Sequence, residues 1–105
     1  MFRTIRKEIE EIASSLKGEF RKIELFIECP LDTGVSVKTN AVCLEGNVAL
    51  SIARVRPFFK FVEELRASSS EKFNRVKITV YPDLRITEER EFDRNLQEQA
   101  ERDVL

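Results

Sequence analysis

Carboxylates are the most plentiful candidates for chemistry in this sequence. Histidine is absent, which removes the commonest general base and metal ligand at neutral pH. The three glycines form no phosphate-binding loop. Glu24 and Glu28 share one face of a predicted strand, but they lie about 13 Å apart at strand rise. The paired carboxyl groups of glycosidases lie at most about 9.5 Å apart, so we expect neither enzyme activity nor a cofactor.

A second group of carboxylates lies near the C-terminus and consists of Glu88, Glu89, Glu91 and Asp93, here called the acidic cluster. Carboxylate oxygens could hold a hard cation, but a solvated charged segment is the simpler interpretation. The functional interpretation is that this acidic end binds a basic partner protein. We predict that the acidic cluster is part of a partner-binding surface.

Two aromatic side chains, Phe26 and Tyr81, are predicted to lie on the outward face of a sheet, among charged residues. The simpler interpretation is that the last helix or the C-terminal segment covers them. The alternative is a binding surface with aromatic anchors and a charged rim, which is how protein interfaces are composed. We predict that both residues contact a protein partner.

Cys29 and Cys43 complete the candidates for chemistry. They lack the C-x-x-C spacing of redox motifs, and without histidine two cysteines cannot form an ordinary structural zinc site. Both lie within strand-like runs, and buried reduced thiols are the usual state in a chain without a secretion signal. We predict that both are reduced, buried and slow to react.

The elements that position these residues follow from the spacing of apolar side chains. An apolar stripe with helical spacing predicts a first helix over about residues 3–17, ending at Gly18. The members of the stripe are Ile5, Ile9, Ile12, Leu16 and Phe20. The charged residues between them are expected to face water, and these are Arg6, Lys7, Glu8, Glu10 and Glu11.

Strict alternation of apolar residues predicts strands. The first strand covers residues 22–29 and ends at Pro30, before a turn at residues 32–34. A second strand over about residues 35–44 is joined by a tight hairpin to a third strand over residues 48–53.

A second helix is predicted to begin near Pro57, whose missing N–H costs nothing in a first turn, and to end at a run of three serines. A fourth strand follows over about residues 76–81. The C-terminal segment is ambiguous, because its apolar residues have helical spacing although a strand could also continue to Phe92. We predict a fifth strand to about Glu91 and a helix from about Arg94.

The expected order is therefore α-β-β-β-α-β-β-α. A five-stranded antiparallel sheet with helices packed on one face is an α+β fold, and residues 1–105 are enough for one such domain. The helices should cover the face formed by Ile23, Leu25, Ile27, Val37, Leu50, Ile52, Val76, Ile78 and Val80. Truncating Ile27 or Leu50 to Ala should then cost about 2–5 kcal/mol.

The composition, with 42% hydrophobic and 35% charged residues, is that of a globular protein. No apolar run is long enough for a membrane span or a signal peptide, so we expect a cytoplasmic protein that does not bind membranes. The net charge of −1 argues against nucleic acid as the partner. The charge is polarised: residues 54–77 carry seven bases and three acids, a net charge of +4, and residues 83–105 carry four bases and eight acids, a net charge of −4.

Several segments are similar to those of a known family. They are Ile9-Glu10-Glu11-Ile12-Ala13, Lys22-Ile23-Glu24-Leu25-Phe26-Ile27-Glu28, Phe61-Val62-Glu63-Glu64-Leu65-Arg66, the strand Val76–Val80 and Glu91-Phe92-Asp93. Through them the chain resembles small bacterial immunity (antitoxin) proteins of the YezG-like kind. The resemblance implies a protein that binds and neutralises a cognate bacterial toxin by stoichiometric interaction, with no catalytic residues.

The same element order also resembles the dimeric chaperones of type III secretion, which are likewise small and often acidic. That resemblance implies a homodimer that forms through elements near the second helix and holds an extended effector segment. The sequence therefore predicts a protein partner and leaves open whether the chain is a monomer or a homodimer.

Overall fold

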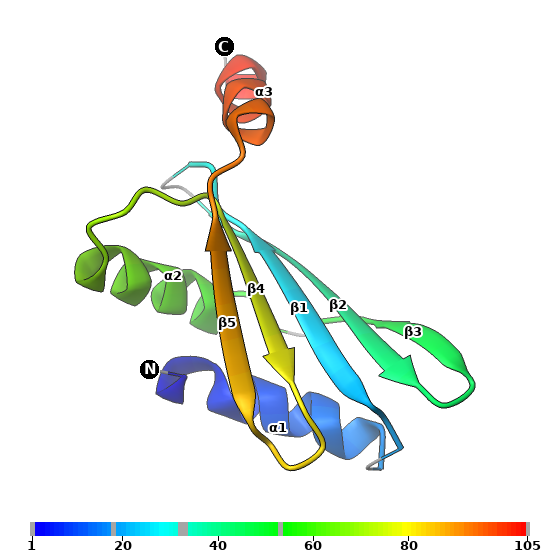
Figure 1. The fold of residues 1–105 in the computed structure, drawn as a ribbon. Coiled ribbons are helices and arrows are strands. Elements are labelled where there is room, and N and C mark those ends of the chain that lie inside the picture. Colours follow the sequence, from blue (N-terminus) through cyan, green and yellow to red (C-terminus); the bar gives the residue numbers. More distant parts are fainter. Residues whose placement is uncertain (1, 18, 32–33, 53, 105) are drawn as a thin grey trace.

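The computed structural model describes residues 2–17, 19–31, 34–52 and 54–104. The predicted order α-β-β-β-α-β-β-α is confirmed, with a short 3-10 turn before the first helix (Figure 1). The elements are η1 (Arg3–Ile5), α1 (Arg6–Ser15), β1 (Lys22–Glu28), β2 (Ser36–Cys43), β3 (Gly46–Leu50), α2 (Arg56–Ser68), β4 (Arg75–Val80), β5 (Ile86–Glu91) and α3 (Arg94–Val104). The predictions that fall on Gly18, Asp32, Thr33 and Ala53 lie outside the described residues.

The five strands form one antiparallel sheet in the order β3-β2-β1-β4-β5. Strand β1 lies at the centre, and its residues Ile23, Leu25 and Ile27 are all buried. Gly46 has a φ of 126° where the β2–β3 hairpin ends, a conformation that favours glycine. The chain then crosses through α2 from the β3 edge to β4, on the other side of β1.

Helices α1 and α2 lie on one side of the sheet (Figure 1) and cover the predicted apolar face at its centre. The alternation in β1 buries Ile23, Leu25 and Ile27, and the partners of these residues on β4 are buried as well. The buried members on β4 and α2 are Val76, Ile78, Val80, Phe58, Phe61, Val62 and Leu65. This centre of the predicted core is confirmed.

Toward β2 and β3 the predicted face packs against the core but is covered only in part. Val37, Leu50 and Ile52 are only partly buried, and Val48 is 44% exposed although it points to the helix side. Strand β3 extends beyond the helix layer (Figure 1), so little covers its underside. Leu50 therefore does not meet the full burial on which its predicted truncation cost depended.

The prediction that Glu8 faces water is also wrong, because its side chain is only 8% exposed. Glu8 lies three residues after Ile5 and four before Ile12, which places it on the buried stripe of the helix. Its Oε1 accepts a hydrogen bond of 2.9 Å from Arg54 Nη2. This ion pair ties α1 to the segment between β3 and α2.

Cys29 and Cys43 are both free thiols. Cys29 is buried as predicted, but Cys43 is only partly buried, so the prediction of burial is wrong for Cys43. Burial raises the pKa of the Cys29 thiol, and the charge and hydrogen bond of Arg66 offset part of that effect.

The two thiols should therefore react at different rates in the native protein. The raised pKa leaves Cys29 protonated at a pH where an ordinary thiol begins to ionise, and only the thiolate attacks a reagent. We expect iodoacetamide at pH 8 to modify Cys43 first and Cys29 only after the protein unfolds. Mass spectrometry of a labelling time course tests this, and equal labelling rates at the two sites would contradict it.

None of the described helices is both long and apolar enough to cross a membrane.

Candidate protein-binding face

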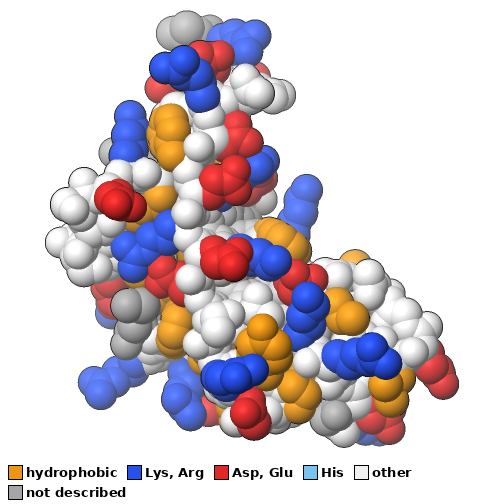
Figure 2. All heavy atoms as spheres, viewed as in Figure 1, with side chains coloured by type: hydrophobic (Ala, Val, Ile, Leu, Met, Phe, Trp, Pro, Cys, Tyr) orange, Lys and Arg blue, Asp and Glu red, His pale blue; other side chains and the backbone are white. Residues whose placement is uncertain are grey.

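The face of the sheet opposite α1 and α2 has no described helix packed over its centre, and we call it the open face (Figure 1). Its side chains form rows across the strands, because directly paired residues point to the same side. One row runs through Lys38, Phe26, Lys77 and Glu89. The next row runs through Ser36, Glu28, Arg75 and Glu91. Figure 2 shows charged side chains of both signs interspersed with apolar ones on the viewed surface.

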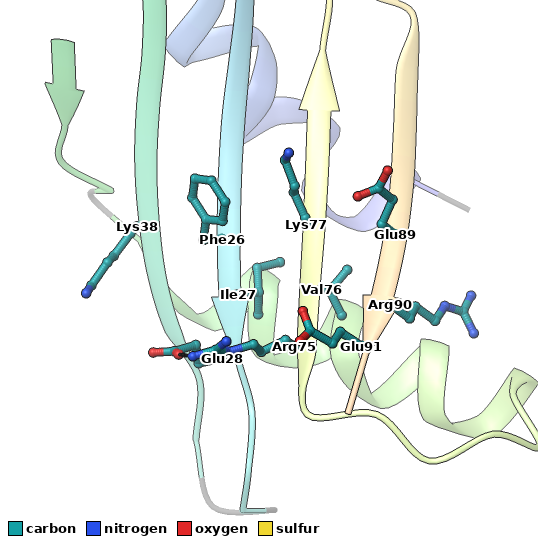
Figure 3. Close-up of a pocket in the computed structure, with 10 residues that line it drawn as sticks. All are labelled: Phe26, Ile27, Glu28, Lys38, Arg75, Val76, Lys77, Glu89, Arg90 and Glu91. Atoms are coloured by element: carbon teal, nitrogen blue, oxygen red, sulfur yellow. Dashed lines mark hydrogen bonds and ion pairs between the residues drawn. The ribbon is translucent and has the colours of Figure 1, made fainter. Parts of the chain in front are cut away.

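A groove of about 700 Å³ lies along these two rows (Figure 3). Phe26 lines it near the centre and is 40% exposed. The Nζ atom of Lys77 lies 5.8 Å from the centroid of the Phe26 ring, within the range of a cation–π contact. A large apolar ring that stays exposed among charges is the pattern of an interface anchor.

Glu24 pairs with Lys77 at the edge of the groove. Lys77 Nζ lies 3.0 Å from Glu24 Oε2. This hydrogen bond, followed by the negative charge of the same carboxylate, raises the pKa of Lys77. Lys77 therefore remains a cation throughout the neutral and mildly alkaline range, and it presents a fixed positive charge beside Phe26.

Arg75 closes one end of the groove. Its Nη2 lies 3.1 Å from Glu28 Oε2, and its Nη1 lies 2.9 Å from Asp93 Oδ2. The guanidinium thus joins the sheet to the start of α3. Its planar fork with several N–H donors suits such a double contact better than a lysine would.

Asn74 fixes the direction in which α3 leaves the sheet. Asn74 is buried, with only 1% of its surface exposed. The Nδ2 atom donates to the backbone oxygen of Asp93 at 2.7 Å and to Gln97 Oε1 at 3.3 Å, while Oδ1 accepts from the Asp93 N–H at 2.8 Å. Asp93 Oδ1 in turn accepts from the Leu96 N–H at 3.1 Å, which caps the helix.

Helix α3 stands beyond the end of the sheet (Figure 1), and none of its described residues is buried. Leu96 and Ala100 face a hollow that also contains Glu28 and Arg75. Glu28 and Arg75 also line the groove around Phe26. The helix therefore forms a wall at one end of the open face, and the two hollows share Glu28 and Arg75 in their linings.

The predicted site residues divide into three places. Phe26, Glu89 and Glu91 line the groove, and Asp93 lies at its corner with Arg75. Tyr81 follows β4 on the same side, but it lies four residues beyond the partner of Phe26, about 13 Å along the strand. The guanidinium carbon of Arg85 lies 4.4 Å from the centroid of the Tyr81 ring, so Phe26 and Tyr81 do not form one aromatic patch.

Glu88 does not belong with the other acids of the cluster. It pairs with the buried Ile78 and therefore points to the helix side of β5. Its side chain is 11% exposed and accepts a hydrogen bond from Arg90 Nε. Alternation along β5 could have revealed this separation, because Glu88 and Glu89 are adjacent in the strand.

Two important residues of this site were not among the predicted ones. Arg75 lies one residue before the predicted fourth strand and begins β4 in the structure, so extending the alternation of that strand by one residue could have located it. Asn74 precedes β4, and nothing in its sequence context signals that it bonds a segment nineteen residues later. The described residues contain no group of three or more His, Cys, Asp or Glu side chains that could hold a metal ion.

Loss of the Asp93 side chain should loosen α3. We expect Asp93→Ala to remove the helix cap and the contact with Arg75, at a cost of about 0.5–2 kcal/mol for the cap. Faster hydrogen exchange of the amides of α3, with little change in β1, would report it. Asp103→Ala, an exposed change in the same helix, is the control and should leave exchange unaltered; equal exchange in both variants would show that Asp93 does not anchor α3.

No protein-family model matches this chain, and no curated protein sequence matches it.

Proposed function

We propose that this domain is an immunity protein that binds a bacterial toxin stoichiometrically through the open face. The observation that carries the proposal is the exposed Phe26 in a groove with a charged rim. Interfaces commonly have this composition, with an aromatic anchor in the middle and polar residues around it. The toxin as partner comes from the resemblance of the chain to immunity proteins.

Charge favours a basic surface on the partner. Lys77 and Arg75 already pair with Glu24 and Glu28 on the open face. Glu89 and Glu91 remain along the β5 side of the groove. Toxins that act on nucleic acid must hold phosphates and therefore have basic clefts, which these two carboxylates complement. Association with such a cleft would be fast and sensitive to salt.

The alternative is a dimeric type III secretion chaperone. The half-covered apolar residues of α3, Leu96 and Ala100, favour it, because self-association could cover them. The outer surface of α2 argues against a dimer through that helix, since it is largely charged. Its exposed residues include Arg56, Lys60, Glu63 and Glu64. Analytical ultracentrifugation separates the two proposals: a monomer that forms a complex with a toxin supports immunity, and a stable dimer that retains an effector fragment supports the chaperone.

The direct test of the immunity proposal is rescue of growth. Products of the genes that adjoin this one are expressed singly in a bacterial host, and any that stops growth is expressed again together with this domain. We expect restored growth and a purified complex of fixed stoichiometry. Absence of rescue for every toxic neighbour would count against the proposal.

The contribution of the two acids can be separated from folding. Glu89→Gln with Glu91→Gln should weaken the complex and reduce the salt dependence of its Kd. Glu10→Gln with Glu63→Gln changes the net charge equally on the helix side and should change neither. A variant that also replaces Asp93 is unsuitable, because Asp93 caps α3.

A further inference from the structure

The two free edges of the sheet differ in character. The β5 edge carries Glu88, Glu89, Arg90 and Glu91, and such charges normally protect an edge strand from pairing. The β3 edge has the sequence Gly-Asn-Val-Ala-Leu and carries no charge or proline. All of β3 except Leu50 is exposed. By this criterion β3 is open to a further strand.

The hydrogen bonds of β2 show which backbone N–H and C=O groups of β3 point to the free edge. The Val42 carbonyl accepts a hydrogen bond of 2.7 Å from the Arg21 N–H, on the β1 side of β2. The polar backbone groups of Val42 therefore point away from β3, and Val42 forms a non-hydrogen-bonded pair with Asn47. Because the pattern alternates, the N–H and C=O groups of Asn47 and Ala49 point to the free edge.

A small cavity of about 180 Å³ lies at the end of this edge, between α1 and the segment after β3. It is lined by Glu8, Glu11, Ser15, Leu50 and Arg54, among others. Glu8 is 6% exposed, and its Oε2 atom is buried without a hydrogen-bond partner. A buried carboxylate oxygen without a donor is costly.

A second unsatisfied group lies on β2, next to the strand whose end forms part of the cavity wall. The Oγ1 atom of Thr39 is buried without a hydrogen-bond partner, and Thr39 pairs directly with Leu50, which lines the cavity. Glu11 adds a further carboxylate at the cavity wall. The cavity lining therefore has two carboxylates, Glu8 and Glu11, against one guanidinium, Arg54, and so an excess of negative charge beside a strand edge.

We propose that an extended segment of a partner protein adds to the β3 edge as a sixth strand and inserts a Lys or Arg side chain into this cavity. Side chains of such a strand alternate between the two faces of the sheet. Those opposite Val48 and Leu50 point to the helix side, where the uncovered underside of β3 receives apolar side chains. The basic side chain donates to Glu8, whose buried carboxylate then has a second donor, and it faces Glu11.

A second copy of this chain does not fit the cavity as well. Pairing of β3 with β3 of a second copy would point Gly46, Val48 and Leu50 to the helix side, and none of these is basic. Strand addition at the β3 edge uses a different surface from the open face. The failure of one proposal therefore leaves the other unaffected.

A short peptide tests the proposal on the full chain. The probe is the acetylated and amidated hexapeptide Thr-Val-Thr-Lys-Thr-Val, which places Val, Lys and Val on one face; the control peptide has Gln in place of Lys. Binding is followed by NMR titration of the backbone amides. We expect the Lys peptide to bind about tenfold more tightly than the Gln peptide and to shift the amides of Asn47 and Ala49.

Variants of the protein assign the two parts of the site. Glu8→Gln should abolish the preference for the Lys peptide, and Glu11→Gln should reduce it. If one of these variants fails to fold, the other still tests the site. Ala49→Pro removes an N–H that faces the free edge, a place where sheets tolerate proline, and should abolish binding of both peptides. Ala49→Thr retains that N–H and should bind normally.

Three results would overturn the proposal. The first is equal affinity for the Lys and Gln peptides in the native protein. The second is no binding of either peptide at about 1 mM, where even a weak complex of about −4 kcal/mol is half formed. The third is a wild-type dimer that Ala49→Pro converts to a monomer, which would assign the edge to a second copy.

Discussion

Replacing Ile27 by Ala is expected to lower the free energy of unfolding by about 2–5 kcal/mol. Ile27 is 1% exposed at the centre of the sheet, and it pairs with Val37 on β2 and Val76 on β4. The truncation leaves a cavity under the helices that rigid neighbours on both sides cannot fill. Because a small domain has a free energy of unfolding of only about 5–15 kcal/mol, this single change removes a large part of its stability.

Leu50→Ala is the matched comparison, since both changes truncate an aliphatic residue on the helix side of the sheet. Leu50 is only partly buried, at the β3 edge, so its truncation should cost clearly less than that of Ile27. Urea denaturation of the two variants measures the difference. Equal destabilisation, or a larger effect for Leu50, would contradict the burial described for the sheet.

The periodicity of the sequence predicts the sheet well, and the reason is physical. A shift of one residue in β1 would replace Ile23, Leu25 and Ile27 in the core by Glu24, Phe26 and Glu28. Two of these three residues are charged, so only one register is compatible with burial. The predicted end of the fifth strand at Glu91 and start of the last helix at Arg94 are confirmed, and the helical spacing of Phe92, Leu96 and Ala100 is the pattern that indicated the helix.

The candidate site is predicted less completely, because it depends on contacts between distant segments. Asn74 holds Asp93 through two hydrogen bonds that cross nineteen residues, and no local pattern encodes such a pairing. Glu8 shows a different limit: its spacing from Ile5 and Ile12 indicated burial, but its charge suggested exposure. The separation of Glu88 from Glu89 follows from strand alternation and was missed by treating the acidic cluster as one group.

Loss of the Phe26 ring should produce the largest effect on partner binding. Phe26 lies in the groove of the open face, flanked on its neighbouring strands by Lys38 and Lys77. Truncation of a central aromatic anchor typically costs about 2 kcal/mol or more, which corresponds to about a thirtyfold increase in Kd. Its 40% exposure means that folding depends on it little, so the thermal midpoint should change only slightly.

Leu44→Ala is a suitable control for this change. Leu44 is 74% exposed in the hairpin between β2 and β3, away from the groove. Its truncation removes exposed apolar surface without altering the open face. The control should bind the partner with the affinity of the unaltered protein.

Isothermal titration of the Phe26→Ala variant against the toxin that the immunity proposal requires, identified by the growth-rescue test, tests binding through the open face most directly. Relative to the unaltered protein and Leu44→Ala, we expect the same stoichiometry and a Kd raised by about thirtyfold. A Kd for Phe26→Ala within about twofold of the control, a difference of about 0.4 kcal/mol, would show that the toxin binds elsewhere on the molecule.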